Sequence, residues 1–107
     1  VEMRMPQVIK SNGTRVPFNA HKLQTSLERA LHKRPVTQEQ IDETVALIEQ
    51  RLYRLGKKEV ASRIVGEMAM EELAKIDQVA YVRFASVYKS FKDVSEFTQV
   101  IAECKAK

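Results

Sequence analysis

Apolar residues at helical spacing limit the fold of this chain more than any other feature. The clearest helix begins at Thr37, which forms a Thr-x-x-Gln capping box with Gln40, and ends at Gly56, a residue that readily adopts the left-handed conformation of a helix C-terminus. The apolar positions between them, at intervals of four, three, four and three, are Ile41, Val45, Ile48, Leu52 and Leu55. One face of this helix is therefore apolar, and the chain is predicted to fold by packing helices.

Four more segments show the same period. A helix is expected over residues 20–33, ending before Pro35 because the residue ahead of a proline avoids the helical conformation. Ser62 and Asp77 are predicted to cap the next two helices, and a last helix follows Asp93. A chain of 107 residues has room for one hydrophobic core, so these helices are expected to form a single domain.

A β-hairpin is predicted ahead of the first helix. Two β-prone runs, residues 7–10 and 14–18, flank the turn Ser11–Gly13, which contains an Asn-Gly pair. Asn-Gly is the strongest short-range hairpin signal because both residues tolerate positive φ. Residues 58–61 are a candidate third strand. The predicted fold class is α+β, a small bundle of four to five helices capped by an N-terminal β-hairpin or three-stranded sheet.

Composition excludes several classes of protein. No apolar run approaches the ~20 residues that span a bilayer, and the first residues are not expected to act as a secretory signal. The single cysteine, Cys104, allows no disulfide framework or Cys-x-x-Cys metal site, so we expect a cytoplasmic protein in which it is a small buried hydrophobe. The acidic residues Glu67, Glu71, Glu72 and Asp77 could suggest paired carboxylates for acid/base chemistry or Mg²⁺, but they are interpreted as a solvated helix face, with Glu71 paired to Lys75. No catalytic residue and no metal ligand is predicted.

Positive charge gathers in the first third of the chain. The first 34 residues hold seven basic and two acidic side chains, whereas the other 73 hold eleven and twelve. A uniformly basic nucleic-acid binder would spread its charge more widely. The local excess is expected to attract phosphates.

Lys10 and Lys22 are the candidate phosphate-binding residues. Lys10 adjoins the hairpin turn, and Lys22 lies in the first turn of the helix that Asn19 is predicted to cap. Unpaired backbone N–H groups, the positive end of a helix dipole and two ammonium groups together favour a polyphosphate. The spacing alone also fits a plain surface hairpin with scattered lysines, since the Walker pattern of phosphate-binding loops is absent.

The sequence also resembles a known family. The run Val8–Leu23 is similar to the opening of the ATP-cone, a nucleotide-sensing module of ribonucleotide reductases and of their regulators. Residues 33–36, and above all the run Asp77–Phe91, resemble the NrdR family of bacterial transcriptional repressors of ribonucleotide reductase genes. The resemblance covers residues 7–104.

This resemblance implies a function. In NrdR proteins an N-terminal zinc ribbon with four cysteines binds DNA, and the ATP-cone binds ATP and dATP as effectors that control oligomeric state and operator binding. By the same resemblance, Lys10 and Lys22 would contact phosphates, while Val8 and Ile9 would contact the base. The implied nucleotide-binding residues are Val8, Ile9, Lys10, Ser11, Asn12, Gly13, Asn19, Lys22, Ser62 and Tyr88.

The chain departs from the family pattern in places. Ser11 stands where many ATP-cones have arginine, and Val16 stands where they have glutamate. The zinc ribbon is absent from these residues, so zinc and operator DNA are expected only in a longer parent protein. We expect residues 1–6 to extend from that missing region, residues 7–104 to form the ATP-cone, and residues 105–107 to form a tail.

Two other functions fit the residues. The chain could be an ATP-cone from a ribonucleotide reductase catalytic subunit, or a nucleic-acid-binding module that uses its basic first third. The aromatic stripe Tyr81, Phe84, Tyr88 and Phe91 could stack bases, but at helical spacing it is more typical of a core or a helix–helix interface. The apolar helix that follows extends this surface, which predicts self-association through the C-terminal helices and no contact with a membrane.

Overall fold

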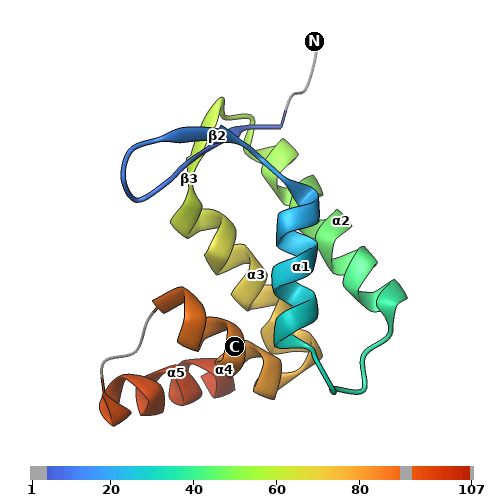
Figure 1. Ribbon diagram of the computed structural model, residues 1–107, viewed down its shortest axis with the longest axis vertical. Coiled ribbons are helices and arrows are strands. Elements are labelled where there is room, and N and C mark those ends of the chain that lie inside the picture. The colour runs from blue at the N-terminus through green and yellow to red at the C-terminus, as the bar shows by residue number, and fades with distance from the viewer. Residues whose placement is uncertain (1–4, 90–92, 107) are drawn as a thin grey trace.

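Five helices and one three-stranded sheet occupy the described residues, 5–89 and 93–106, of the computed structural model (Figure 1). In chain order they are β1 (Gln7–Ile9), β2 (Arg15–Pro17), α1 (Ala20–Ala30), α2 (Gln38–Leu55), β3 (Glu59–Ala61), α3 (Ser62–Ile76), α4 (Gln78–Lys89) and α5 (Val94–Ala106). The sheet lies at one end of the helices, and α4 and α5 lie at the other. The predicted α+β class, a helical bundle capped by an N-terminal sheet, is confirmed.

The sheet has the order β2-β1-β3, so β1 is its central strand. Val8 pairs with Val16 in the antiparallel hairpin and with Val60 in the parallel pair. The hairpin turn closes through a bond from the Thr14 N–H to Asn12 Oδ1 (2.9 Å), and Gly13 has a φ of 87°, in the left-handed region that favours glycine. Both the hairpin and the third strand are confirmed.

Most of the predicted helix ends are confirmed. The Asn19 side chain accepts a hydrogen bond from the Lys22 N–H at 3.1 Å, and Thr37 and Gln40 form the full capping box. Asp77 Oδ1 accepts from the Ala80 N–H at 3.0 Å at the start of α4. Gly56 ends α2 with a φ of 63°. These caps satisfy backbone groups that would otherwise lack partners at the helix ends.

Two helix ends were predicted wrongly. Helix α1 ends at Ala30 rather than at residue 33, because the chain leaves the helical conformation there and Lys33 takes a φ of 62°. Ser62 does not cap α3: the capping position is Ala61, which has no side-chain hydrogen bond, and Ser62 is the first helical residue. Strand β3 runs directly into α3, since Ala61 still pairs with Ile9, and no loop is left for a capping side chain.

The core is formed by the inner faces of all five helices together with β3. Leu27, Ile48, Leu52 and Leu73 are fully buried, and Tyr81 is buried with them. Cys104 is also buried and belongs to this core, as its place in an apolar stripe predicted. Phe91, the last member of the aromatic stripe, lies outside the described residues.

Helix α4 is held against the end of α1 by polar contacts. Arg34, just after α1, forms an ion pair with Asp77 (Nε to Oδ2, 2.8 Å). Arg83 of α4 donates to the backbone oxygen of His32 at 2.6 Å, so its guanidinium binds carbonyl groups left unpaired at the end of α1. Within the described ranges, none of the helices is both long enough and apolar enough to cross a membrane.

Candidate functional site

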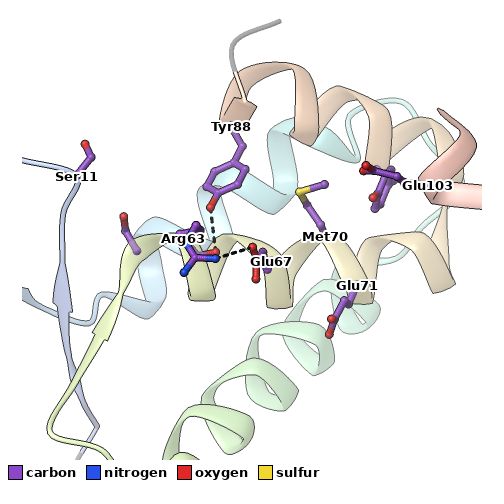
Figure 2. A pocket seen from close by; sticks show the side chains of 9 residues that line it. Ser11, Arg63, Glu67, Met70, Glu71, Tyr88 and Glu103 are labelled. Carbon is purple, nitrogen blue, oxygen red and sulfur yellow. Dashed lines mark hydrogen bonds and ion pairs between the residues drawn. The ribbon is translucent and has the colours of Figure 1, made fainter. Parts of the chain in front are cut away.

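A cavity of about 640 Å³ opens between the hairpin turn, α3, α4 and α5. Figure 2 shows Ser11 at one side of it and Glu71 and Glu103 at the other, with Tyr88 between them. The residues that line it are Ser11, Ser62, Arg63, Glu67, Met70, Glu71, Tyr81, Tyr88 and Glu103. Its volume is in the range of about 300–1,000 Å³ that is typical of small-molecule sites.

One face of α3 forms the floor of the cavity. Residues 62, 63, 67, 70 and 71 all line it, and their spacing of one, four, three and one places them on one side of a helix. The first and the last of them are nine positions apart in the helix, which corresponds to about 13 Å along the helix axis. The floor is therefore an elongated strip whose two ends can bind different chemical groups.

Tyr88 closes the cavity from α4. Its hydroxyl donates to the backbone oxygen of Arg63 at 2.9 Å, and its ring lies so close to Gly66 that a Cβ there would overlap it. Burial raises the pKa of the Tyr88 hydroxyl, and Glu67 adds to the effect, while Arg63 opposes it. Tyr88 thus joins α4 to the first turns of α3 as a neutral hydrogen-bond donor.

The lining carries more acidic than basic groups. Arg63 is its single cation, and it pairs with Glu67 at 3.3 Å. Glu71 pairs with Arg51 of α2 at 2.7 Å, and not with Lys75, whose ammonium lies 3.5 Å from Glu72 instead. The predicted pair between Glu71 and Lys75 is wrong because α2 packs beside α3 and supplies a closer guanidinium. The prediction of a solvated face is also wrong for Glu72 and Asp77, whose side chains are nearly buried beside Arg51 and Arg34.

Tyr81 lines the cavity from the core side. It is fully buried, and its hydroxyl has no hydrogen-bond partner among the residues that the structure describes. Burial raises the pKa of this hydroxyl, and the nearby Glu103 and Cys104 raise it further. Tyr81 therefore keeps its proton at neutral pH and is able to donate or accept one hydrogen bond.

The structure brings together three of the predicted site residues. Ser11 from the hairpin turn, Ser62 from α3 and Tyr88 from α4 line the same cavity. Lys10 and Lys22 are both exposed and are not part of its lining, and neither forms an ion pair within the described part of the chain.

The remaining predicted residues have structural tasks in the hairpin and at the start of α1. The side-chain oxygens of Asn12 and Asn19 accept from backbone N–H groups, while Val8 and Ile9 are half-buried in β1. Gly13 supplies the positive φ of the turn.

Sequence reasoning missed most of the cavity wall. Arg63, Glu67, Met70 and Glu71 recur at helical spacing after Ser62, and this spacing is the signal that could have placed them on one face with it. Tyr81 was predicted to lie in the core or at a helix–helix interface, and it is buried in the core, but its place at the cavity depends on contacts between helices. No cluster of three or more possible metal ligands occurs in the described ranges.

Comparison with known proteins identifies relatives. A model of the ATP cone domain matches residues 6–94. The transcriptional repressor NrdR of Laribacter hongkongensis is 56% identical over 102 residues, which cover 95% of this chain and 67% of that protein. The transcriptional repressors NrdR of Nitrosomonas eutropha and Cupriavidus necator are 55% and 51% identical over 106 residues, covering 99% of this chain and 66% and 68% of theirs.

The chain thus spans about two thirds of the length of the curated relatives that it matches. The matches support a nucleotide-sensing regulatory domain, and the fold agrees with them. Similarity of more than half the residues across nearly the whole chain, together with the domain match, shows that the chain belongs to the NrdR family of transcriptional repressors and carries an ATP cone domain.

Proposed function

We propose that this chain senses ATP and dATP for a bacterial repressor of ribonucleotide reductase genes. The bound nucleotide controls the oligomeric state of the longer protein, and the oligomeric state controls its binding to operator DNA. Operator contact is assigned to a zinc ribbon in the longer protein, outside these 107 residues. ATP and dATP act as effectors and are not hydrolysed.

The meeting of three separate elements at one cavity is the observation that carries this proposal. Ser11, Ser62 and Tyr88 were each predicted to border a nucleotide, and all three line the cavity between the hairpin turn, α3 and α4. The cavity is large enough for a small-molecule ligand. A plain surface hairpin, the alternative that the spacing left open, would not need such a space beneath its turn.

The triphosphate is assigned to the hairpin end. Lys10 adjoins Ser11 there, and the ammonium groups of Lys10 and Lys22 form no ion pair with any described residue. The first N–H groups of a helix lack partners within the helix, and at α1 the Asn19 side chain satisfies only that of Lys22. Asn12 and Gly13 shape the turn, and Val8 and Ile9 anchor it in the sheet.

Discrimination between ATP and dATP requires coupling between the site and a subunit interface, because the two nucleotides differ by one hydroxyl. Couplings of this kind are typically ~1–3 kcal/mol, enough to shift an oligomer equilibrium by about 5- to 150-fold. The hydrogen bond from Arg83 to the backbone after α1 connects α1 to α4, so a displacement of α1 on nucleotide binding would also move α4. Exposed apolar side chains of α4 and α5, Val87 and Val94, support self-association through these helices.

Calorimetric titration with ATP and with dATP, combined with light scattering of each complex, tests the proposal. We expect saturable binding of both nucleotides and a different oligomeric state with each. Lys10→Ala and Lys22→Ala should weaken ATP binding by about tenfold to a hundredfold, since each removes a charged hydrogen-bond donor from the phosphates. Lys105→Ala, on an exposed residue near the end of α5, is the matched control and should bind normally.

Three results would contradict this function. Unchanged affinity in both lysine variants would remove the phosphate assignment. Non-saturating binding of nucleic acid, with affinity that falls steeply as salt rises, would favour the nucleic-acid-binding alternative. Release of inorganic phosphate from ATP by the purified chain would show turnover.

A further inference from the structure

The connection between α1 and α2 is held by helix α4 at two points. The carbonyl oxygens of Ala30 and His32 both accept hydrogen bonds from Nη1 of Arg83, at 3.4 and 2.6 Å. A little further along the connection, Arg34 forms its ion pair with Asp77, which precedes α4 (Nε to Oδ2, 2.8 Å). We call these two sets of contacts the clamp.

Lys33 lies between the two points of the clamp in a strained conformation. Its φ is 62°, and among the described residues it is the one non-glycine residue with a positive φ. A residue with a Cβ adopts this conformation at a cost in free energy, so it persists only where the surrounding structure holds it. Helix α4 holds both neighbours of Lys33, His32 through its carbonyl group and Arg34 through its side chain. Opening of the clamp would therefore release the strain at Lys33.

The interface between α1 and α4 is incompletely filled beside the clamp. A hollow of about 300 Å³ lies there, with Ser26 and Arg29 of α1 on one side and Phe84 and Val87 of α4 on the other. Closely packed interfaces resist small displacements, whereas an unfilled one resists them less. The polar contacts of the clamp are thus well placed to decide how α4 sits against the end of α1.

Helix α1 joins the clamp to the residues that were assigned to the phosphates. Asn19 and Lys22 lie at the start of the helix, and Ala30, whose carbonyl oxygen bonds to Arg83, is its last residue. The eleven residues of α1 correspond to about 16 Å along the helix axis. A shift at the start of this short helix would therefore reach the clamp at its other end.

Helix α4 joins the clamp to the cavity. The cavity has a hairpin end, at Ser11, and a far end, where Figure 2 shows Glu71 and Glu103 on the side away from Ser11. Tyr88 of α4 lines the cavity between these ends, and the same helix carries Arg83. One helix thus contacts both the cavity and the end of α1.

We infer that the clamp is the two-state element of the nucleotide response, with Arg83 as its positioning residue. In the closed state, which this structure shows, Arg83 holds α4 on the end of α1 and Lys33 is strained; in the open state the bonds are broken and Lys33 relaxes. This inference rests on the proposed sensing of ATP and dATP, and it adds the element that transmits occupancy to α4. A nucleotide shifts the balance between the two states by the ratio of its affinities for them.

Thermodynamic linkage provides a readout that a merely structural role of Arg83 would not change. If nucleotide binding alters association of the chain, association alters nucleotide affinity by the same factor. The apparent affinity for a nucleotide then depends on the concentration of the chain. Equilibrium dialysis with ATP and with dATP, at chain concentrations about a hundredfold apart, measures this dependence.

Arg83→Met is the main variant, because it keeps an apolar stem and removes the hydrogen-bond donors. In the wild-type chain, the apparent affinity for at least one nucleotide should change by about fivefold or more between the two concentrations. Arg83→Met should match the wild type within about twofold at the low concentration and show no change at the high one. Arg34→Met breaks the other point of the clamp and should also reduce the change, so it tests the inference even if Arg83→Met does not fold.

Two controls accompany the dialysis. Arg83→Lys should retain most of the concentration dependence, because one nitrogen of Arg83 makes both bonds and an ammonium group is able to replace it. Arg29→Met makes the same chemical change as Arg83→Met on an exposed residue of α1 beside the same hollow, and should behave as the wild type.

Thermal unfolding tests the strain at Lys33 separately. Lys33→Gly and Lys33→Ala both remove the charged side chain, but only glycine is unstrained at a φ of 62°. Lys33→Gly should therefore melt at the higher temperature of the two. An equal or lower melting temperature in Lys33→Gly would overturn the strained closed state.

The outcomes separate this inference from the proposed function. A wild-type concentration dependence that persists in both Arg83→Met and Arg34→Met would overturn the clamp and leave the function intact. Tenfold weaker binding by Arg83→Met at the low concentration would make Arg83 part of the binding site and overturn its positioning role. Absence of saturable binding of either nucleotide by the wild-type chain would overturn the proposed function itself.

Discussion

The hairpin end and the far end of the cavity are built in different ways. At the hairpin end, the turn and the start of α1 are fixed by hydrogen bonds between residues close in the chain, as Asn12 accepts from the Thr14 N–H and Asn19 from the Lys22 N–H. The far end is assembled from α3, α4 and α5, and Tyr81 belongs both to it and to the hydrophobic core. Changes at the hairpin end should therefore affect binding more than stability, whereas changes near the far end should affect stability first.

The largest expected effect comes from the core beside the far end. Leu73 of α3 is fully buried, so Leu73→Ala should lower the free energy of unfolding by about 2–5 kcal/mol. Urea unfolding measures the loss. Leu47→Ala, at a residue that is 47% exposed on α2, is the control and should change stability by about 0.5 kcal/mol or less. A similar effect of both variants would mean that the burial of Leu73 does not set its contribution to stability.

The next largest loss of stability is expected at Asp77, which caps the start of α4. Asp77→Ala removes both the cap on the Ala80 N–H and the ion pair with Arg34, at a cost of about 2 kcal/mol. Burial opposes ionisation of this carboxyl, but the hydrogen bonds from Ala80 and Arg34 outweigh it, so its pKa lies below the ordinary value of 3.8.

The sign of the pH dependence at Asp77 follows. Because the folded state holds the lower pKa, this contribution is complete above about pH 4 and is lost as the pH falls through the folded pKa. Urea unfolding at pH 7 and at successively lower pH should show the wild-type advantage over Asp77→Ala shrinking in that acidic range. An advantage that grows on acidification would contradict the assignment.

A smaller change in stability is expected at the hairpin turn, together with a loss of binding. Gly13 has a φ of 87° and an open space around its Cα, so Gly13→Ala should cost about 1 kcal/mol through backbone strain alone. Gly56→Ala is a matched control, because Gly56 has a φ of 63° and equally open surroundings at the end of α2. We expect similar melting temperatures for the two variants, but weaker ATP binding only in Gly13→Ala.

The smallest change in the free energy of unfolding is expected at Tyr88. Tyr88→Phe removes the hydrogen bond to the backbone oxygen of Arg63 but keeps the ring over Gly66, so the free energy of unfolding should fall by about 0.5–1 kcal/mol. Thermal unfolding detects this change, with Tyr53→Phe as the control. A change above about 3 kcal/mol would mean that the hydroxyl, rather than the ring, holds α4 on α3.

The parts of the molecule that were predictable from sequence are those set by neighbouring residues. The Asn-Gly turn, the capping box of Thr37 and the left-handed Gly56 depend on a few residues each, and all were predicted. Ser62 has the side chain of a cap, yet Ala61 occupies the capping position because the parallel pairing of β3 with β1 extends to it. That pairing joins segments about fifty residues apart, and local patterns do not show it.

The candidate site shows the same division. Ser11, Ser62 and Tyr88 were predicted from the resemblance, and the structure brings them together. Glu71 looked like part of a solvated surface because its partner, Arg51, lies on another helix. A hydroxyl without a partner, such as that of Tyr81, is visible only when the surrounding helices are in place.

The direct passage of β3 into α3 has a consequence for how this molecule could respond to a ligand. Strand β1 is bonded to β2 on one side and to β3 on the other, and β3 continues into the helix that forms the cavity floor. The hairpin and α3, which lie on two sides of the cavity, are therefore joined through the sheet. They cannot move apart without breaking hydrogen bonds between its strands. If the proposed function holds, we expect tightening around a nucleotide to come from the opposite side, through displacement of α4 and α5, and so to alter their outward surfaces.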